Sequence, residues 1–152
     1  MAGGWTDAAW NYCNHYDLLD TTAPMPEHRY AYLFNETCVW GGSGFRLIDQ
    51  RQENLVDPDT YTKLRFDINP GEDVDGLKHV WVLLANGSLV PKLSDYLPPD
   101  IQPNTWVHVT IPLADLNSTK SPYMHVFFQT DTDQAIDFRL DNVILYDDSV
   151  QR

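Results

Sequence analysis

The sequence predicts an antiparallel β-sandwich with jelly-roll topology, formed by a single domain over residues 1–152. Apolar and polar residues alternate along most of the chain, which is the period of a strand with one buried face. Glycine, proline, asparagine and aspartate separate these short runs, as the turns between sandwich strands require. Hydrophobic residues make up 43% of the chain, which is enough for a core without a metal or a disulfide framework.

The predicted strands follow the alternating runs in chain order. They cover residues 29–35, 44–50, 61–69, 77–87, 104–112, 121–131 and 135–147. The cleanest run is YTKLRFDIN, in which Leu64, Phe66 and Ile68 share one face. Pro112 ends its strand because it lacks a backbone donor, and LADL after it is predicted to form one helical turn. The glycine-rich segment VWGGSG (39–44) is predicted to be a loop.

The run SPYMHVFFQTD (121–131) has two dissimilar faces. One face carries ordinary core residues, which are Met124, Val126 and Phe128. The other mixes aromatic rings with hydrogen-bonding groups, which are Tyr123, His125, Phe127 and Gln129. In the run 77–87, Val80 and Val82 likewise face inward while His79 and Trp81 face outward. Such outward faces are unusual for a surface that meets only water.

A mixed aromatic and polar face fits carbohydrate, because a flat ring stacks on the C–H face of a pyranose. Planar polar side chains then make paired hydrogen bonds to adjacent hydroxyl groups. Treating the outward rows as one surface, we predict a shallow concave groove. Its predicted ligand-binding residues are Trp81, Arg65, Asp67, His79, His125, Phe127, Gln129, Tyr61 and Arg139, with Asp137 beside them. The alternative is that loops cover the rings and the charges pair with one another.

The net charge of −12 argues against nucleic acids and anionic membranes as partners, because phosphate groups need clustered Lys and Arg. Neutral sugars, metal cations and basic partners remain open. The apolar run VWVLLA (80–85) is far too short to span a bilayer.

Two features predict a secreted, extracellular glycoprotein, although MAGGWTD lacks the basic start and apolar stretch of a signal peptide. Cys13 and Cys38 are an even pair that is compatible with one disulfide, the alternative being two unrelated buried thiols. Three acceptor patterns for N-glycosylation occur, at Asn35, Asn86 and Asn117.

Four segments, GWTDAAWNY, TYTKLRFDINPG, NTWVHVTIPLADL and FRLDNVILYD, occur in this order along the chain. From Trp5 to Asp147 the chain resembles the galactose-binding-like, jelly-roll carbohydrate-binding modules attached to cellulases and other glycan-degrading enzymes. The resemblance implies non-catalytic binding of a polysaccharide or oligosaccharide, of the β-glucan type, beside a neighbouring catalytic domain. The sugar, its linkage and the oligomeric state do not follow from the sequence.

The resemblance also implies a structural calcium ion, because such an ion often ties the first strand of these modules to the last. The matching closing position is Asp141, and Asp7 or Asp17 would supply a partner carboxylate. Calcium takes six to eight oxygen ligands, several of them backbone carbonyls. The alternative is that these carboxylates are solvated surface charges.

Two other functional classes are open. A jelly-roll polysaccharide lyase would use His125, Tyr123, Gln129 and Arg139, and a glycoside hydrolase would pair Asp67 with Asp137. An enzyme is disfavoured because 152 residues leave little room for loops that close a cleft around acid–base groups. A cell-surface adhesion or matrix protein would instead show an exposed apolar patch without a polar groove.

Overall fold

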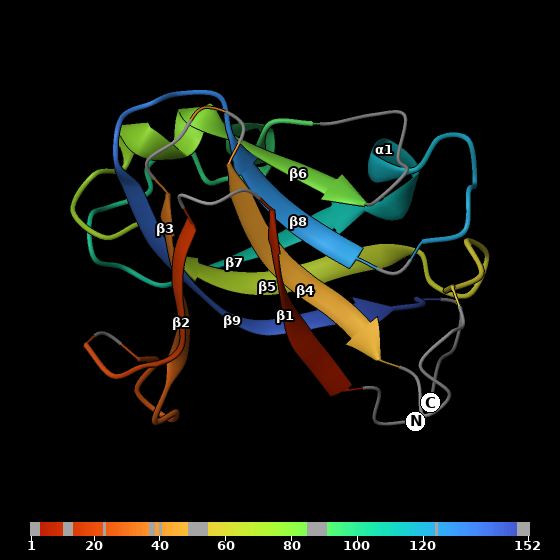
Figure 1. The fold of residues 1–152 in the computed structure, drawn as a ribbon, viewed down its shortest axis with the longest axis horizontal. Helices are drawn as coiled ribbons and strands as arrows, with labels where there is room; N and C mark the ends of the chain where they lie inside the picture. The colour runs from red at the N-terminus through yellow and green to blue at the C-terminus, as the bar shows by residue number, and fades with distance from the viewer. Residues whose placement is uncertain are drawn as a thin grey trace.

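The computed structural model describes residues 4–10, 14–22, 24–36, 39, 41–48, 55–84, 91–123 and 125–148, with side chains from Asp20 onward except at 36, 47 and 48. Two antiparallel sheets pack face to face, which confirms the predicted jelly-roll sandwich (Figure 1). Sheet A has four strands in the order β1-β4-β8-β6, and sheet B has five in the order β2-β3-β9-β5-β7. From β4 to β9, each strand along the chain lies in the opposite sheet from the one before it.

The strand bounds locate the predicted runs. Sheet A consists of β1 (Gly4–Trp10), β4 (Gly42–Ile48), β6 (Val80–Leu84) and β8 (His125–Thr130). Sheet B consists of β2 (Asn14–Asp20), β3 (Ala31–Glu36), β5 (Lys63–Asn69), β7 (Val107–Pro112) and β9 (Ile136–Tyr146). The sequence runs did not predict β1 and β2. The helical pieces are short: η1 (Asp75–His79), η2 (Leu93–Tyr96) and the predicted single turn α1 (Leu113–Leu116).

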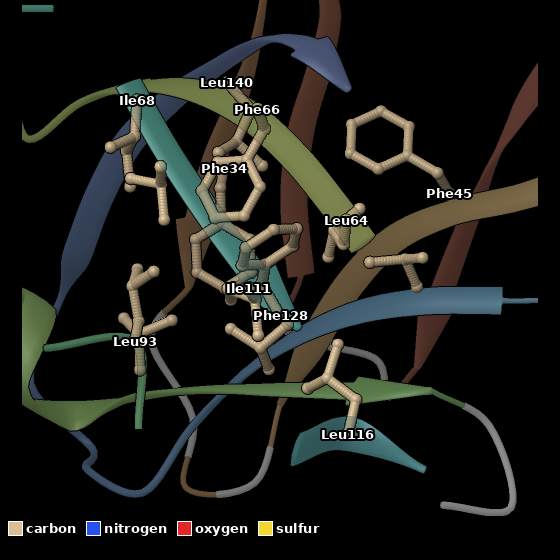
Figure 2. Close-up of a cluster of buried hydrophobic side chains, with 14 of the residues drawn as sticks. Phe34, Phe45, Leu64, Phe66, Ile68, Leu93, Ile111, Leu116, Phe128 and Leu140 are labelled. Carbon is tan, nitrogen blue, oxygen red and sulfur yellow. The ribbon is translucent and has the colours of Figure 1, made fainter. Parts of the chain in front are cut away.

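The core lies between the two sheets and is built from the alternating apolar positions. Buried and half-buried residues alternate along β6 and β8 and through most of β5, so the predicted inward faces are confirmed. Figure 2 shows Phe34, Phe66 and Phe128 gathered between the sheets. Phe66 meets Phe128 edge to face with ring centroids 5.3 Å apart. Each fully buried side chain of this size stabilises the fold by about 1.5–3 kcal/mol through the hydrophobic effect.

Two local predictions are wrong. The segment 39–44 is not entirely a loop, because Gly42, Ser43 and Gly44 belong to β4. Tyr123 does not share the outward face of His125, because it is 2% exposed and packs in the core. A bridge to Val56 lies at this point, so the strand alternation of β8 does not extend back to Tyr123. No helix within the described residues has the length and hydrophobicity needed to cross a membrane.

Candidate functional site: the outer face of sheet A

The predicted ligand-binding residues divide between two surfaces. Arg65 and Asp67 lie on β5 and Arg139 on β9, in sheet B. Trp81 lies on β6, and His125, Phe127 and Gln129 lie on β8, in sheet A. Because the core lies between the sheets, these outward side chains are on opposite sides of the molecule and do not form one groove.

On the outer face of sheet B the charged groups pair with one another. The Nε of Arg139 donates to Oδ2 of Asp20 at 2.6 Å, and its terminal nitrogen donates to Oγ1 of Thr22 at 2.8 Å. His108 Nδ1 lies 2.9 Å from Oδ1 of Asp67. Arg65 places its guanidinium over the ring of Tyr146, 5.3 Å from the centroid. Except at Arg65, whose Nε has no hydrogen-bond partner among the described residues, this surface matches the alternative in which charges satisfy each other.

The Asp20–Arg139 pair is well buried, with 6% and 14% of the two side chains exposed. Burial alone would raise the pKa of Asp20, but hydrogen bonds from Thr22 and Arg139 outweigh it and hold this pKa below its ordinary value. A carboxylate whose pKa is lowered by folding adds stability above its unfolded pKa, about 3.9. That stability is lost as the pH falls through the lower folded value.

We therefore predict that Asp20→Asn lowers the free energy of unfolding at pH 7 by about 1–3 kcal/mol. Urea unfolding at pH 7 and at a pH below the folded pKa of Asp20 measures the difference, which should shrink towards zero in acid. Asp137→Asn is the matched control, because Asp137 is half exposed and its Oδ2 lies 4.0 Å from Arg139. An equal loss of stability at both pH values would contradict the assignment.

The outer face of sheet A is different in kind. We call it the aromatic face; its members are Trp81 and Leu83 of β6, His125, Phe127 and Gln129 of β8, and Arg46 of β4. Across the sheet, Trp81 lies opposite Gln129 and Leu83 lies opposite Phe127. Each of these residues on β6 and β8 is half-buried, and Arg46 is exposed. In Figure 1 these strands form the front layer.

Glycines form the third row of the aromatic face. Gly42 lies opposite Gln129 and Gly44 lies opposite Phe127. A Cβ atom on Gly44 would lie 2.0 Å from the carbonyl oxygen of Val126, and one on Gly42 would lie 2.7 Å from that of Phe128. Only glycine permits this close approach of β4 to β8. Gly42 and Gly44 are both buried, so beside Phe127 and Gln129 this row adds no side chain to the face.

Hydrogen bonds hold Trp81 in place. Its Nε1 donates to Oδ2 of Asp131 at 2.8 Å, and His79 Nδ1 lies 2.8 Å from Oδ1 of the same carboxylate. Burial would raise the pKa of Asp131, but the bonds from His79 and Trp81 lower it overall. Lys92 places its ammonium 4.9 Å from the centroid of the indole. Trp81 thus has no free N–H, and Lys92 lies over one face of its half-buried ring. His79 supports the indole as a member of this network.

His125 and Phe127 form a second aromatic unit. Their rings stack at 5.1 Å with an interplanar angle of 22°. The Nδ1 of His125 is buried and has no hydrogen-bond partner among the described residues. Burial, and to a smaller degree the charge of Arg46, lowers the pKa of His125, so the imidazole is neutral at pH 7. The face therefore combines flat rings and neutral hydrogen-bonding groups with one charged member, Arg46.

The residues predicted for catalysis do not assemble. Of the lyase set, His125 and Gln129 are on the aromatic face, Arg139 is on the opposite sheet and Tyr123 is in the core. Of the hydrolase pair, Asp67 of β5 lies opposite Asp141, and Asp137 is four residues further along β9, about 13 Å away. Asp67 instead lies 2.9 Å from His108 and accepts a hydrogen bond from Asn142 at 2.7 Å. The last predicted ligand residue, Tyr61, precedes β5 and lines a separate pocket.

Asp141 does not form a calcium site with the other described side chains. Its Oδ2 lies 2.5 Å from His28 Nδ1, and its Oδ1 accepts the backbone N–H of Asn142 at 2.7 Å. The described part of the chain holds no group of three or more His, Cys, Asp or Glu spaced to hold a metal ion. Backbone pairing places Asp7 opposite Phe45 and Asp17 opposite Leu33, but the side chains of both aspartates lie outside the described set. Calcium remains a prediction.

The described residues bear on only some of the glycosylation and disulfide predictions. Cys13, Cys38 and Asn86 lie outside the described residues. Asn35 is half-buried on β3, opposite Asp137. Asn117 is 6% exposed; its Nδ2 donates to the carbonyl of Ser121 at 2.7 Å, and its Oδ1 accepts the N–H of Ser121 at 2.9 Å. Glycosylation at Asn117 stays a prediction, for a side chain that is buried and bonded to Ser121 through both amide atoms.

No protein-family model and no curated protein matches the sequence. Solved structures do match the fold. One is a family 11 carbohydrate-binding module from Clostridium thermocellum, in complex with a β-1,3-1,4-mixed-linked tetrasaccharide. The TM-score is 0.58 at 12% identity, over 94% of this chain and 88% of the module.

Two longer proteins contain the same sandwich. SGBP-B from a complex xyloglucan utilization locus in Bacteroides uniformis gives a TM-score of 0.61 at 16% identity, over 95% of this chain and 47% of that protein. A β-1,2-glucanase from Parabacteroides distasonis gives 0.61 at 16% identity, over 99% of this chain and 23% of the enzyme. The chain thus spans less than half the length of either protein, and at these identities the likeness shows the fold alone. That fold is the jelly-roll sandwich of carbohydrate-binding modules, as the sequence resemblance implied.

Proposed function

We propose that this chain is a non-catalytic carbohydrate-binding module that binds a polysaccharide on the aromatic face of sheet A. One observation carries the proposal: half-buried rings and an amide lie in register on the adjacent strands β6 and β8. The rings of Trp81 and Phe127 would stack on the C–H faces of sugar units. The Gln129 amide and Nε2 of His125 would bond to hydroxyl groups.

The dimensions of the face favour a chain of several sugars over a single one. Three cross-strand rows follow each other along β8, and they contain Gln129, Phe127 and His125. Rows two residues apart are separated by about 6.7 Å, so the three rows span about 13 Å. A flat strip of this length suits a short stretch of an extended polysaccharide. The net charge of −12 favours a neutral one, and we propose the β-glucan type.

The sequence resemblance supports an extracellular module that acts beside a glycan-degrading domain. The module would keep that domain close to its polysaccharide and would not itself break glycosidic bonds. The dispersal of the predicted lyase residues over two sheets and the core supports this division of labour.

Affinity electrophoresis in gels that contain mixed-linked β-glucan, xyloglucan or an acidic polysaccharide tests the proposal. We expect a neutral glucan to retard the protein and Phe127→Ala to reduce the retardation at least about tenfold in apparent affinity. Leu33→Ala is the matched control, because Leu33 is a half-buried apolar residue of β3 that pairs with Arg139 on sheet B.

Equal retardation of wild type and Phe127→Ala would rule out the aromatic face. Free migration of the wild type in every gel would rule out polysaccharide binding. New reducing ends or unsaturated products after incubation with the polysaccharide would contradict the non-catalytic assignment and favour the lyase or hydrolase alternative.

A further inference from the structure

A pocket with a volume of about 250 Å³ lies outside the aromatic face. It is enclosed by three parts of the chain: the turn before β5, the α1 turn, and the segment that leads into β8. The residues that matter most to its chemistry are Asp59, Tyr61, Thr62, Ser118, Lys120 and Tyr123. None of the aromatic-face residues lines it.

Tyr123 lines this pocket, and its buried hydroxyl is an unsatisfied hydrogen-bonding group. The residue is 2% exposed, and its hydroxyl has no hydrogen-bond partner among the described residues. Buried polar groups without partners are rare and costly, so each needs an explanation. Burial, with a smaller contribution from Tyr61, raises the pKa of the Tyr123 phenol, which therefore stays a neutral donor and acceptor. A ligand hydroxyl in the pocket would supply the partner that the fold does not.

The rim of the pocket is held by specific contacts. Both amide atoms of Asn117 bond to the backbone of Ser121 and close the turn between them. Lys120 in that turn adopts a φ of 52°, which a non-glycine residue takes up only when its surroundings enforce it. Its ammonium lies 2.6 Å from Oδ1 of Asp59 and ties this turn to the one before β5. The pocket is thus preformed by segments about sixty residues apart.

The residues that line the pocket indicate that its ligand is a neutral polyol. The hydroxyl groups of Tyr61, Thr62 and Ser118 are uncharged, and the ion pair of Asp59 with Lys120 balances itself. Neighbouring carboxylate and ammonium groups offer acceptors and donors to vicinal hydroxyls, while Tyr61 offers a ring for C–H contact. The pocket volume equals that of about eight water molecules at about 30 Å³ each. A pocket of this size accommodates one six-membered sugar ring and excludes a longer chain.

We infer that this pocket is a second carbohydrate site, which binds a single neutral pyranose unit such as the end of a saccharide chain. The inference is argued from the chemistry of this pocket and does not depend on the aromatic face. A protein with both sites would hold a chain along sheet A and a separate chain end at the pocket.

A titration of the ¹⁵N-labelled protein with glucose, followed by amide chemical shifts, tests the inference. It is done in the Trp81→Ala background, so that failure of the aromatic-face proposal cannot change the result. We expect saturable shifts at Tyr61 and at residues 118–121. Tyr123→Phe should weaken glucose binding roughly threefold to tenfold, since one hydrogen bond is lost. Its thermal midpoint should stay the same or rise, because the buried hydroxyl without a partner is gone.

Tyr30→Phe is the matched control, because Tyr30 is 41% exposed and does not line this pocket. Asp59→Asn is a second variant at an exposed rim position, and it should also weaken glucose binding without unfolding the chain. Absence of saturable shifts at these amides would overturn the inference. So would glucose affinity that is unchanged in both Tyr123→Phe and Asp59→Asn.

Discussion

Gly44→Ala is expected to lower the free energy of unfolding by about 3 kcal/mol and to disrupt binding at the aromatic face. The added Cβ would meet the Val126 carbonyl oxygen at 2.0 Å and the Phe127 Cα at 2.8 Å. Both are backbone atoms, so no side-chain rotation relieves the overlap. Strand β4 must therefore move away from β8. The expected loss of stability lies at the upper end of the usual range for overpacking. Chemical unfolding in urea measures the effect.

Arg46→Ala is the matched control for this substitution. Arg46 is on the same strand and faces the same way, but it is exposed and lies opposite His125. Removing its side chain should change the free energy of unfolding by less than about 0.5 kcal/mol. If Gly44→Ala were as stable as Arg46→Ala, the close approach of β4 to β8 would be incorrect.

Trp81→Ala is expected to abolish retention on the polysaccharide while the fold persists. Tryptophan at the centre of a binding surface commonly accounts for at least about 2 kcal/mol, which is roughly thirtyfold in affinity. The substitution also frees Asp131 and Lys92 from their contacts with the indole, so unfolding is measured alongside binding. Retention in affinity gels and the urea midpoint together separate lost binding from lost folding.

Trp81→Phe distinguishes stacking from hydrogen bonding. It keeps one six-membered aromatic ring on the face and removes the five-membered ring of the indole, with the N–H that donates to Asp131. Because that N–H is already engaged within the protein, Trp81→Phe should retain much of the affinity. Loss of binding in Trp81→Phe equal to that in Trp81→Ala would contradict the stacking role, as would full retention in Trp81→Ala.

The alternation of apolar and polar residues correctly predicted which side chains of each strand face the core. Burial of one face of a strand directly requires this alternation. Leu64 and Phe66 face the core, and Val80 and Val82 do the same on β6. The outward position of Trp81 follows from the same pattern, and the residue is half-buried, whereas its neighbours Val80 and Val82 are in the core. These positions depend only on the two-residue period of a strand.

Alternation could not assign strands to sheets. Arg65 and Trp81 both face outward, yet β5 and β6 belong to different sheets, so the predicted common groove does not exist. Sheet membership depends on pairing between distant segments, such as β6 with β8 and β5 with β9, which no local pattern specifies. The burial of Tyr123 has the same origin, because its partner Val56 is far away in the sequence. The glycines of β4 resembled a loop because their close contact with β8 is also non-local.

Amide chemical-shift mapping with a β-1,3-1,4-mixed-linked tetrasaccharide tests the central claim most directly, because it locates the ligand on one of the two sheets. We predict saturable shifts at the Trp81 indole N–H and at the amides of Phe127 and Gln129, with none at Asp67 or His108. Saturable shifts confined to the outer face of sheet B, or no saturable shift with any neutral glucan, would contradict binding on the aromatic face.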